Sequence, residues 1–245
     1  MVAYLTAGDP APERTGELAL ALERGGADVL ELGVPFSDPI ADGPVIQRAS
    51  DRALKAGTTV AKVLAIAAEI RLQTEMPMIL FSYMNPLMRY GFDKLCADAR
   101  AAGIDGCLFT DLSVEEADPT VATMKKHGLD TVFLAAPTST ERRLKLVAEY
   151  SSGFVYVVSR TGVTGTQDSV AGGVDGLVSE LRQLTSLPLA VGFGISRREH
   201  VQAVGSYADG VVVGSAFMRV VEEYGAAPDL AARVEAFGKE LTGRP

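Results

Sequence analysis

The sequence predicts an α/β protein that folds as a (β/α)8 barrel, in a single domain over residues 1–245. Eight short apolar runs alternate with amphipathic segments, and no linker or low-complexity stretch interrupts them. Continuous apolar strands are typical of a parallel sheet that is covered on both faces. The length suits one barrel, because barrels of about 250 residues are routinely single domains. An open eight-stranded sheet has the same periodicity, but strict alternation favours the closed barrel.

The predicted strands are short and rich in Val, Leu, Ile and Phe. They cover residues 2–7, 28–33, 77–83, 105–110, 131–136, 153–159, 188–194 and 209–215. Intervening segments such as 11–27, 58–73 and 92–103 carry apolar residues at helical spacing. Gly follows several of them, as expected for helix C-caps. In a barrel of this kind, functional residues lie at the C-terminal ends of the strands and in the loops that follow.

Composition excludes several classes of partner. There are 31 acidic and 23 basic residues, a net charge of -8, and no cluster of Lys and Arg. This balance argues against nucleic acid or an anionic membrane. No segment resembles a signal peptide or a membrane span. Cys96 and Cys107 have no CxxC spacing, and buried reduced thiols indicate a cytoplasmic protein.

Three acidic residues accompany the second predicted strand: Glu31 within it, and Asp38 and Asp42 in the loop after it. If Leu30 and Leu32 face the helices, alternation places Glu31 inside the barrel. A carboxyl group in a half-dry pocket has a raised pKa, which suits proton transfer near neutral pH. The alternatives are a structural ion pair for Glu31 and turn capping for Asp38 and Asp42. Three carboxylates in one segment at the barrel top favour a functional site.

Glycine-rich loops follow the last three predicted strands, at residues 159–166, 192–196 and 213–217. Strand–Gly–helix transitions expose backbone N–H groups that bind phosphate, and phosphate sites after strands seven and eight recur in barrels. The three loops therefore predict a phosphate site, although purely structural turns remain the alternative. The first of these loops is long and rich in Gly, Thr and Ser, as are lids that close on a ligand.

Together these motifs resemble the α subunit of tryptophan synthase. The resemblance runs from residue 3 to about 220. It is carried, in order, by YLTAGDP, ELGVPFSDPIADGP, YMNP, APTST, GVTGT, GFGIS and ADGVVVGSAF. The second motif is highly specific, whereas the Gly loops are shared with other phosphate-binding barrels.

The resemblance implies retro-aldol cleavage of indole-3-glycerol phosphate to indole and D-glyceraldehyde 3-phosphate, a step of tryptophan biosynthesis. By motif, Glu31 resembles the general acid/base and Asp42 the carboxylate that engages the indole N–H. Thr164 resembles the residue that links lid closure to Asp42, and Asp38 a loop residue at the contact with a β subunit. The implied substrate-binding positions are Tyr4, Phe81, Tyr83, Thr110 and Phe193 for the indole, and Gly165, Gly194, Gly214 and Ser215 for the phosphate.

The resemblance also implies a partner, a β subunit that holds pyridoxal phosphate in an α2β2 heterotetramer and receives the indole. We expect no cofactor and no metal in this chain. A barrel kept only to activate the β subunit is an alternative, but such a scaffold needs neither Glu31 nor Asp42. Another phosphate-sugar enzyme is a second alternative, yet a Schiff-base aldolase needs an inward Lys and no predicted strand contains one. The family usually carries a helix before the first strand; here we expect either a truncated start or another seal for the barrel floor.

Overall fold

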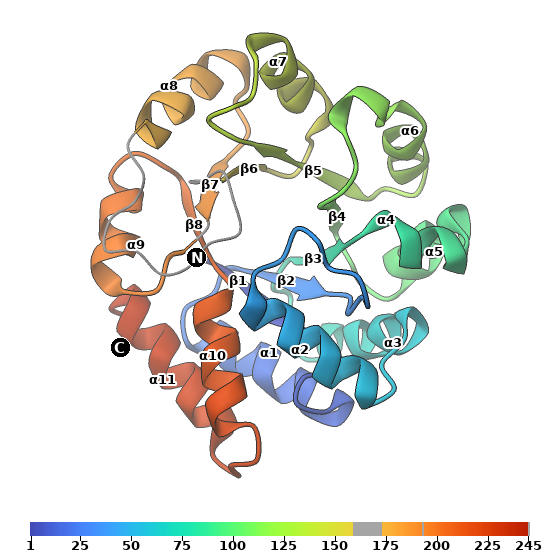
Figure 1. Ribbon diagram of the computed structural model, residues 1–245, viewed down its shortest axis with the longest axis vertical. Helices are drawn as coiled ribbons and strands as arrows, with labels where there is room; N and C mark the ends of the chain where they lie inside the picture. Colours follow the sequence, from blue (N-terminus) through green and yellow to red (C-terminus); the bar gives the residue numbers. More distant parts are fainter. Residues whose placement is uncertain (159–172, 193, 245) are drawn as a thin grey trace.

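The computed structural model describes residues 1–158, 173–192 and 194–244. Its parallel strands form a closed barrel in which each strand pairs with the next and β8 pairs with β1 (Figure 1). Each observed strand lies inside its predicted range, except that β5 begins one residue earlier. The strands are β1 Val2–Thr6, β2 Val29–Gly33, β3 Met78–Ser82, β4 Gly106–Phe109, β5 Asp130–Ala135, β6 Val155–Val158, β7 Leu189–Gly192 and β8 Gly210–Val213. The predicted (β/α)8 barrel is confirmed.

Helices surround the barrel on its outside (Figure 1). They are α1 Thr15–Arg24, α2 Pro44–Lys55, α3 Val60–Arg71, α4 Met84–Tyr90, α5 Phe92–Ala101, α6 Asp118–Lys126, α7 Glu141–Tyr150, α8 Val174–Leu184, α9 Arg198–Gly205, α10 Ser215–Tyr224 and α11 Leu230–Thr242, with short 3-10 helices at Pro12–Arg14 and Val114–Glu116. Helices α1, α3 and α5 match the segments predicted at 11–27, 58–73 and 92–103, and the other α-helices lie outside these three ranges. The start of α2 is nonetheless visible in the sequence, because Pro44 occupies its first turn.

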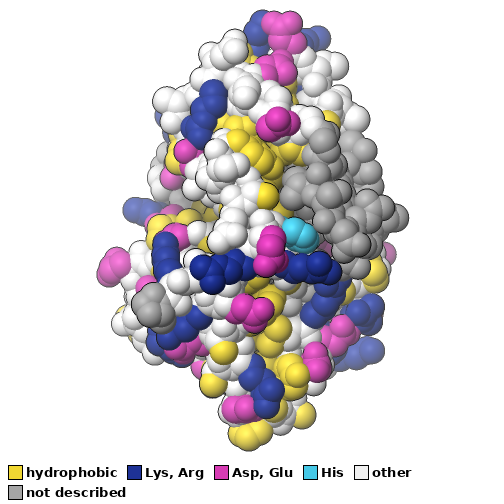
Figure 2. Space-filling model, turned by 90° about the vertical axis from the view of Figure 1, so that its left-hand side faces the viewer, with side chains coloured by type: hydrophobic (Ala, Val, Ile, Leu, Met, Phe, Trp, Pro, Cys, Tyr) yellow, Lys and Arg dark blue, Asp and Glu magenta, His cyan; other side chains and the backbone are white. Residues whose placement is uncertain are grey.

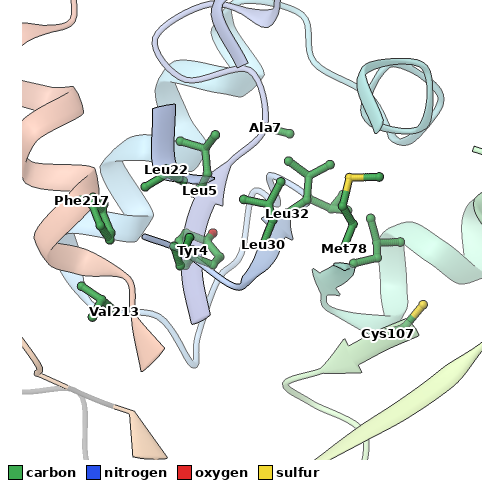
Figure 3. Packing of buried hydrophobic residues seen from close by; sticks show 14 of the residues in the cluster. Tyr4, Leu5, Ala7, Leu22, Leu30, Leu32, Met78, Cys107, Val213 and Phe217 are labelled. Carbon is green, nitrogen blue, oxygen red and sulfur yellow. The ribbon is translucent and has the colours of Figure 1, made fainter. Parts of the chain in front are cut away.

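The apolar residues form two layers separated by the strands. Leu30 and Leu32 belong to the outer layer, packed with helix residues such as Leu22 and Phe217 (Figure 3). The inner layer fills the barrel with Val2, Ile79, Leu108, Val132, Phe154, Tyr156, Ala190 and Val212. Val29 packs on this inner layer, so the alternation along β2 is as predicted and Glu31 points inward.

The floor of the barrel, at the N-terminal ends of the strands, holds a cavity of about 330 Å³. Its walls include Val2, Val29 and Ile79 from the inner layer. Asp28, Asp105, Asp130 and Asp209 also line it. This cavity lies at the opposite end of the strands from the predicted site.

Charged side chains are mixed on the face shown in Figure 2, where a short band of Lys and Arg is flanked by Asp and Glu. That face therefore presents no large area of a single sign. Across residues 1–158, 173–192 and 194–244, no helix combines the length and the apolar character that a membrane span requires.

Candidate active site

Glu31 is a buried carboxyl group inside the barrel. It lies on β2, between Tyr4 of β1 and Ile79 of β3 in the register of the sheet. The residue is 1% exposed, and its Oε1 atom has no hydrogen-bond partner among the described residues. Burial raises the pKa of Glu31 to about 8. Because no basic side chain of the described residues pairs with it, the structural ion-pair alternative is not supported.

Asp42 lies in the loop between β2 and α2 and meets Tyr83, which directly follows β3. The Tyr83 hydroxyl donates to Asp42 Oδ2 over 3.0 Å and accepts from the backbone N–H of Ala41 over 2.9 Å. Burial raises the pKa of Asp42 to about 6, against the lowering effect of the Tyr83 hydrogen bond. Asp42 is thus held by a side chain at the end of a neighbouring strand. A residue that only caps its own turn needs no such distant partner.

Aromatic side chains surround the two carboxyl groups. The Tyr4 and Phe81 rings meet edge to face, with centroids 5.2 Å apart, and Phe36 packs against Tyr83 at the same centroid distance of 5.2 Å. Burial raises the pKa of Tyr83, and a hydrogen bond with Thr110 opposes that rise. The predicted residues Tyr4, Phe81, Tyr83 and Thr110 therefore gather with Glu31 and Asp42.

Tyr156 of β6 belongs to this group, although the sequence analysis does not identify it. Burial and the negative charges of Glu31 and Asp42 raise its pKa well above the ordinary value. Gly192 on the next strand leaves room for its ring, since a Cβ there would overlap the Tyr156 hydroxyl. The sequence does carry a signal for this residue, because Tyr156 is the one polar side chain in the aliphatic strand VYVV.

The predicted phosphate-binding residues are placed only in part. Ser215 is the first residue of α10, whose N-terminus has no side-chain cap, and Gly214 precedes it. A Cβ at Gly214 would lie 3.4 Å from the Cβ of Tyr4, so this helix start adjoins the Tyr4 side of the site. Gly194 follows β7 with a φ of +84°. Thr164, Gly165 and Phe193 lie outside the described residues, and their roles stay predictions.

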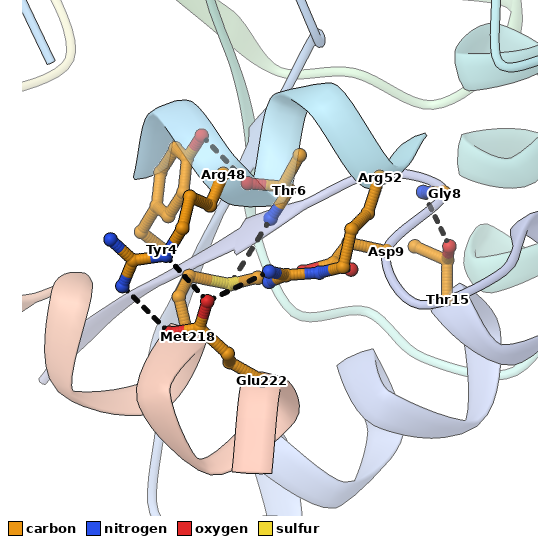
Figure 4. Close-up of polar contacts among 9 residues, drawn as sticks. All are labelled: Tyr4, Thr6, Gly8, Asp9, Thr15, Arg48, Arg52, Met218 and Glu222. Atoms are coloured by element: carbon orange, nitrogen blue, oxygen red, sulfur yellow. Dashed lines mark hydrogen bonds and ion pairs between the residues drawn. The ribbon is translucent and has the colours of Figure 1, made fainter. Parts of the chain in front are cut away.

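Ion pairs tie helix α2, which follows the Asp42 loop, to two other elements (Figure 4). Arg52 donates to both carboxylate oxygens of the fully buried Asp9, over 2.8 and 2.9 Å. Arg52 also donates to Glu222 of α10 over 3.0 Å, and Arg48 donates to Glu222 over 2.6 and 2.8 Å. Helix α2, which directly follows the Asp42 loop, is therefore held against the helix that begins at Ser215.

Asp38 is separate from the catalytic candidates. It is exposed, and its carboxylate accepts from the Ser37 hydroxyl. Ile40, two residues later, is 79% exposed. No metal-binding cluster of three or more His, Cys, Asp or Glu side chains occurs in the part of the chain that the structure describes.

Comparison with known proteins identifies the family of the chain. A family model described as tryptophan synthase alpha chain matches residues 1–242. The tryptophan synthase alpha chain of Solibacter usitatus is 63% identical over 241 residues, which cover 98% of this chain and 90% of that protein. The one from Geobacter sulfurreducens is 46% identical over 241 residues, 98% of this chain and 91% of that protein.

The fold agrees as well. A solved structure of the tryptophan synthase α2β2 complex from Pyrococcus furiosus contains a chain that matches with a TM-score of 0.93 and 39% identity. The match covers 99% of this chain and 97% of that chain. On the sequence match, the fold and the site together, the chain belongs to the tryptophan synthase alpha chain family.

Proposed function

We propose that this chain is a carbon–carbon lyase that cleaves indole-3-glycerol phosphate to indole and D-glyceraldehyde 3-phosphate in tryptophan biosynthesis. The observation that carries the proposal is the pairing of two unlike carboxyl groups at one end of the barrel. Glu31 is buried and its Oε1 atom has no hydrogen-bond partner among the described residues, whereas Asp42 accepts a hydrogen bond from Tyr83. Such a pair supplies a neutral acid and an anion at the same pH.

The proton balance of the cleavage fits these two groups. Neutral Glu31 gives its proton to C3 of the indole ring, and the ionised Asp42 stabilises the positive charge that then develops on the ring N–H. The bond from C3 to the glycerol chain breaks, its electrons return to the ring, and the neighbouring hydroxyl becomes an aldehyde. The Glu31 carboxylate takes the hydroxyl proton, which restores the starting enzyme. Acid/base catalysis of this kind contributes about 10²–10⁴-fold.

The other site residues bind the substrate in this proposal. The rings of Tyr4, Phe81 and Tyr83, together with Thr110, hold the indole between the two carboxyl groups. The start of α10 at Gly214 and Ser215, with Gly194, holds the phosphate through backbone N–H groups. Phe193, Thr164 and Gly165 complete the pocket by their place in the family motifs.

We further propose a tryptophan synthase β subunit as the partner, in an α2β2 heterotetramer, with Asp38 at the contact. The α2β2 complex of Pyrococcus furiosus, which contains a chain of the same fold, supports this assembly. Ile40, two residues after Asp38, is exposed and offers the β subunit an apolar side chain on the same loop. The lyase step needs no cofactor in this chain, and pyridoxal phosphate belongs to the partner. The free, buried Cys96 and Cys107 support a cytoplasmic location.

The test is indole release from indole-3-glycerol phosphate by the wild type and by Glu31→Gln, with and without a β subunit. We expect the wild type to release indole, faster with the β subunit, and the variant to lose about 10²–10⁴-fold in kcat. Circular dichroism checks that the variant is folded. A wild type that is inactive alone and with the β subunit, yet accelerates the β subunit's own reaction, would instead support the scaffold alternative.

A further inference from the structure

Thr6 places a buried hydroxyl beside the site that the proposed mechanism does not use. The residue is fully buried at the C-terminal end of β1. Its Oγ1 atom lies 3.1 Å from the hydroxyl oxygen of Tyr4, within hydrogen-bond distance, and its backbone N–H donates to Met218 Sδ over 3.5 Å (Figure 4). Contacts on both sides therefore fix where the Thr6 hydroxyl lies.

The Tyr4 ring is next to Glu31, yet its hydroxyl does not bond to it. Tyr4 and Glu31 are partners in the sheet register, and their side chains share the barrel interior. Burial, and then the negative charges of Asp42 and Glu31, raise the pKa of Tyr4. The hydroxyl is nevertheless paired with Thr6, and Glu31 Oε1 has no partner among the described residues.

Gly33 makes this placement of the ring possible. It is the register partner of Thr6, and a Cβ at Gly33 would overlap the Tyr4 hydroxyl. The Tyr4 hydroxyl thus occupies the space above Gly33, where Thr6 can reach it. Thr6 on β1 and Gly33 on β2 therefore set the direction of the Tyr4 side chain.

We propose that Thr6 is a positioning residue, whose hydroxyl holds the Tyr4 hydroxyl away from Glu31 and leaves a carboxyl oxygen of Glu31 free to exchange a proton with the substrate. This inference rests on the proposed function, because it assigns a purpose to an unpaired Glu31. A phenol that donates to a carboxylate stabilises the ionised form and occupies one of its oxygens. If Thr6 did not bind it, the Tyr4 hydroxyl could donate to Glu31 and lower the pKa of that carboxyl group. Glu31 would then be a poorer proton donor near neutral pH.

The surroundings of Glu31 single out Tyr4 for this role. The titratable groups that the described structure places around it are Tyr4 from β1, Tyr156 from β6 and Asp42 from the loop after β2, to which Tyr83 is bonded. No Lys or Arg of the described residues pairs with Glu31. Without the Thr6 hydroxyl, the Tyr4 hydroxyl would lose its buried partner. Because an unpaired buried donor costs free energy, we expect it to turn to another acceptor nearby, which is Glu31.

The test replaces Thr6 by Val, which keeps the shape and removes the hydroxyl, and by Ser, which keeps the hydroxyl. The ionisation of Glu31 is followed in the free protein by carbon-13 NMR of labelled Glu carboxyl groups, assigned by the signal missing in Glu31→Gln. The pH profile of indole release by the same variants is the second readout. We expect Thr6→Val to move this ionisation about one pH unit lower in both readouts, and Thr6→Ser to leave it in place.

A double substitution shows whether Thr6 acts through Tyr4. In a Tyr4→Phe protein the phenol is gone, so adding Thr6→Val should not move the Glu31 ionisation further. Tyr4→Phe alone should leave it at or above the wild-type pH, and this variant decides the matter if Thr6→Val does not fold. The proposal is overturned by an unmoved ionisation in Thr6→Val, by an equal shift in the Tyr4→Phe background, or by a fall in Tyr4→Phe alone.

The two readouts keep this proposal separate from the proposed function. A wild type that releases no indole, alone or with a β subunit, would contradict the lyase activity. The NMR titration of the free protein needs no turnover and still decides whether Thr6 governs Glu31.

Discussion

Glu31 and Asp42 differ because their surroundings differ. Both carboxyl groups lie near Tyr4 and Tyr156, and burial raises the pKa of each. Asp42 receives a hydrogen bond from Tyr83, which favours its ionised form and leaves its pKa at about 6. The Oε1 atom of Glu31 receives none from residues 1–158, 173–192 and 194–244, and burial raises the pKa of Glu31 to about 8. Near pH 7 one group is therefore mainly neutral and the other mainly ionised, as the proposed reaction requires.

This difference predicts a bell-shaped dependence of kcat/KM on pH. Activity should fall below about pH 6 as Asp42 becomes protonated, and above about pH 8 as Glu31 loses its proton. Asp42→Asn should lower kcat about 10²–10³-fold, because the charge on the indole N–H loses its counter-ion, and should abolish the acid limb. Indole release measured from pH 5 to 9 checks both expectations.

Tyr83→Phe is the matched control for the acid limb. It keeps the ring but removes the hydroxyl that donates to Asp42, so the pKa of Asp42 should rise and the limb should move to higher pH. An acid limb that stays near pH 6 in Asp42→Asn would assign it to a group other than Asp42.

At the scale of elements, the start of α10 carries the predicted phosphate site. Gly214→Asp should weaken binding of glycerol 3-phosphate at least about tenfold, because the new carboxylate repels the phosphate. Gly214→Asn has nearly the same size without the charge, and should bind more tightly than Gly214→Asp. The Cβ at this position meets only ordinary contacts with Tyr4, so both variants should fold. Calorimetric titration measures the affinities, and equal losses in the two variants would point to a steric effect instead.

Short-range sequence patterns could predict the strands but not the contacts between their ends. The strands are mainly apolar, and alternation along β2 correctly placed Glu31 inside the barrel. Helix α4 begins two residues after β3 and spans only Met84–Tyr90, too short for a clear helical period. The Tyr83–Asp42 hydrogen bond joins residues 41 positions apart, and the place of Tyr156 depends on space left by Gly192 on another strand. Such pairings follow from barrel closure, which no local pattern encodes.

Across the whole molecule, the Asp9–Arg52–Glu222 ion pairs join the turn after β1 to α2 and α10 around the upper end of the barrel. Asp9 is fully buried, and burial raises its pKa although its bonds to Arg52 oppose the rise. Removing one member of a buried pair leaves an unpaired charge, whereas the pair itself adds little stability. The network therefore fixes the position of α2, which follows the Asp42 loop, relative to α10.

The burial of Glu31 also lowers the stability of the whole barrel, by an amount that depends on pH. Its pKa is about 8 in the folded protein, against an ordinary value of 4.5. Between these pH values the folded protein binds more protons at Glu31 than the unfolded chain, so the free energy of unfolding falls as pH rises. The difference between the two pKa values corresponds to at most about 5 kcal/mol in the free energy of unfolding. All of this free energy is lost above pH 8.

Glu31→Gln removes the titration and should therefore stabilise the protein at high pH while it abolishes activity. We expect its Tm to exceed that of the wild type by roughly 10 °C at pH 9, with a difference that shrinks towards pH 4, since about 1 kcal/mol shifts Tm by about 2–4 °C at this size. Scanning calorimetry from pH 4 to 9 measures this, with Asp38→Asn as a control that removes an exposed carboxylate. A gain in Tm that is the same at every pH would mean that the substituted amide side chain packs better, and that Glu31 is not held neutral in the folded barrel. A gain in Tm that grows with pH would instead show that the wild-type barrel is less stable because it keeps the proton donor Glu31 buried at its centre.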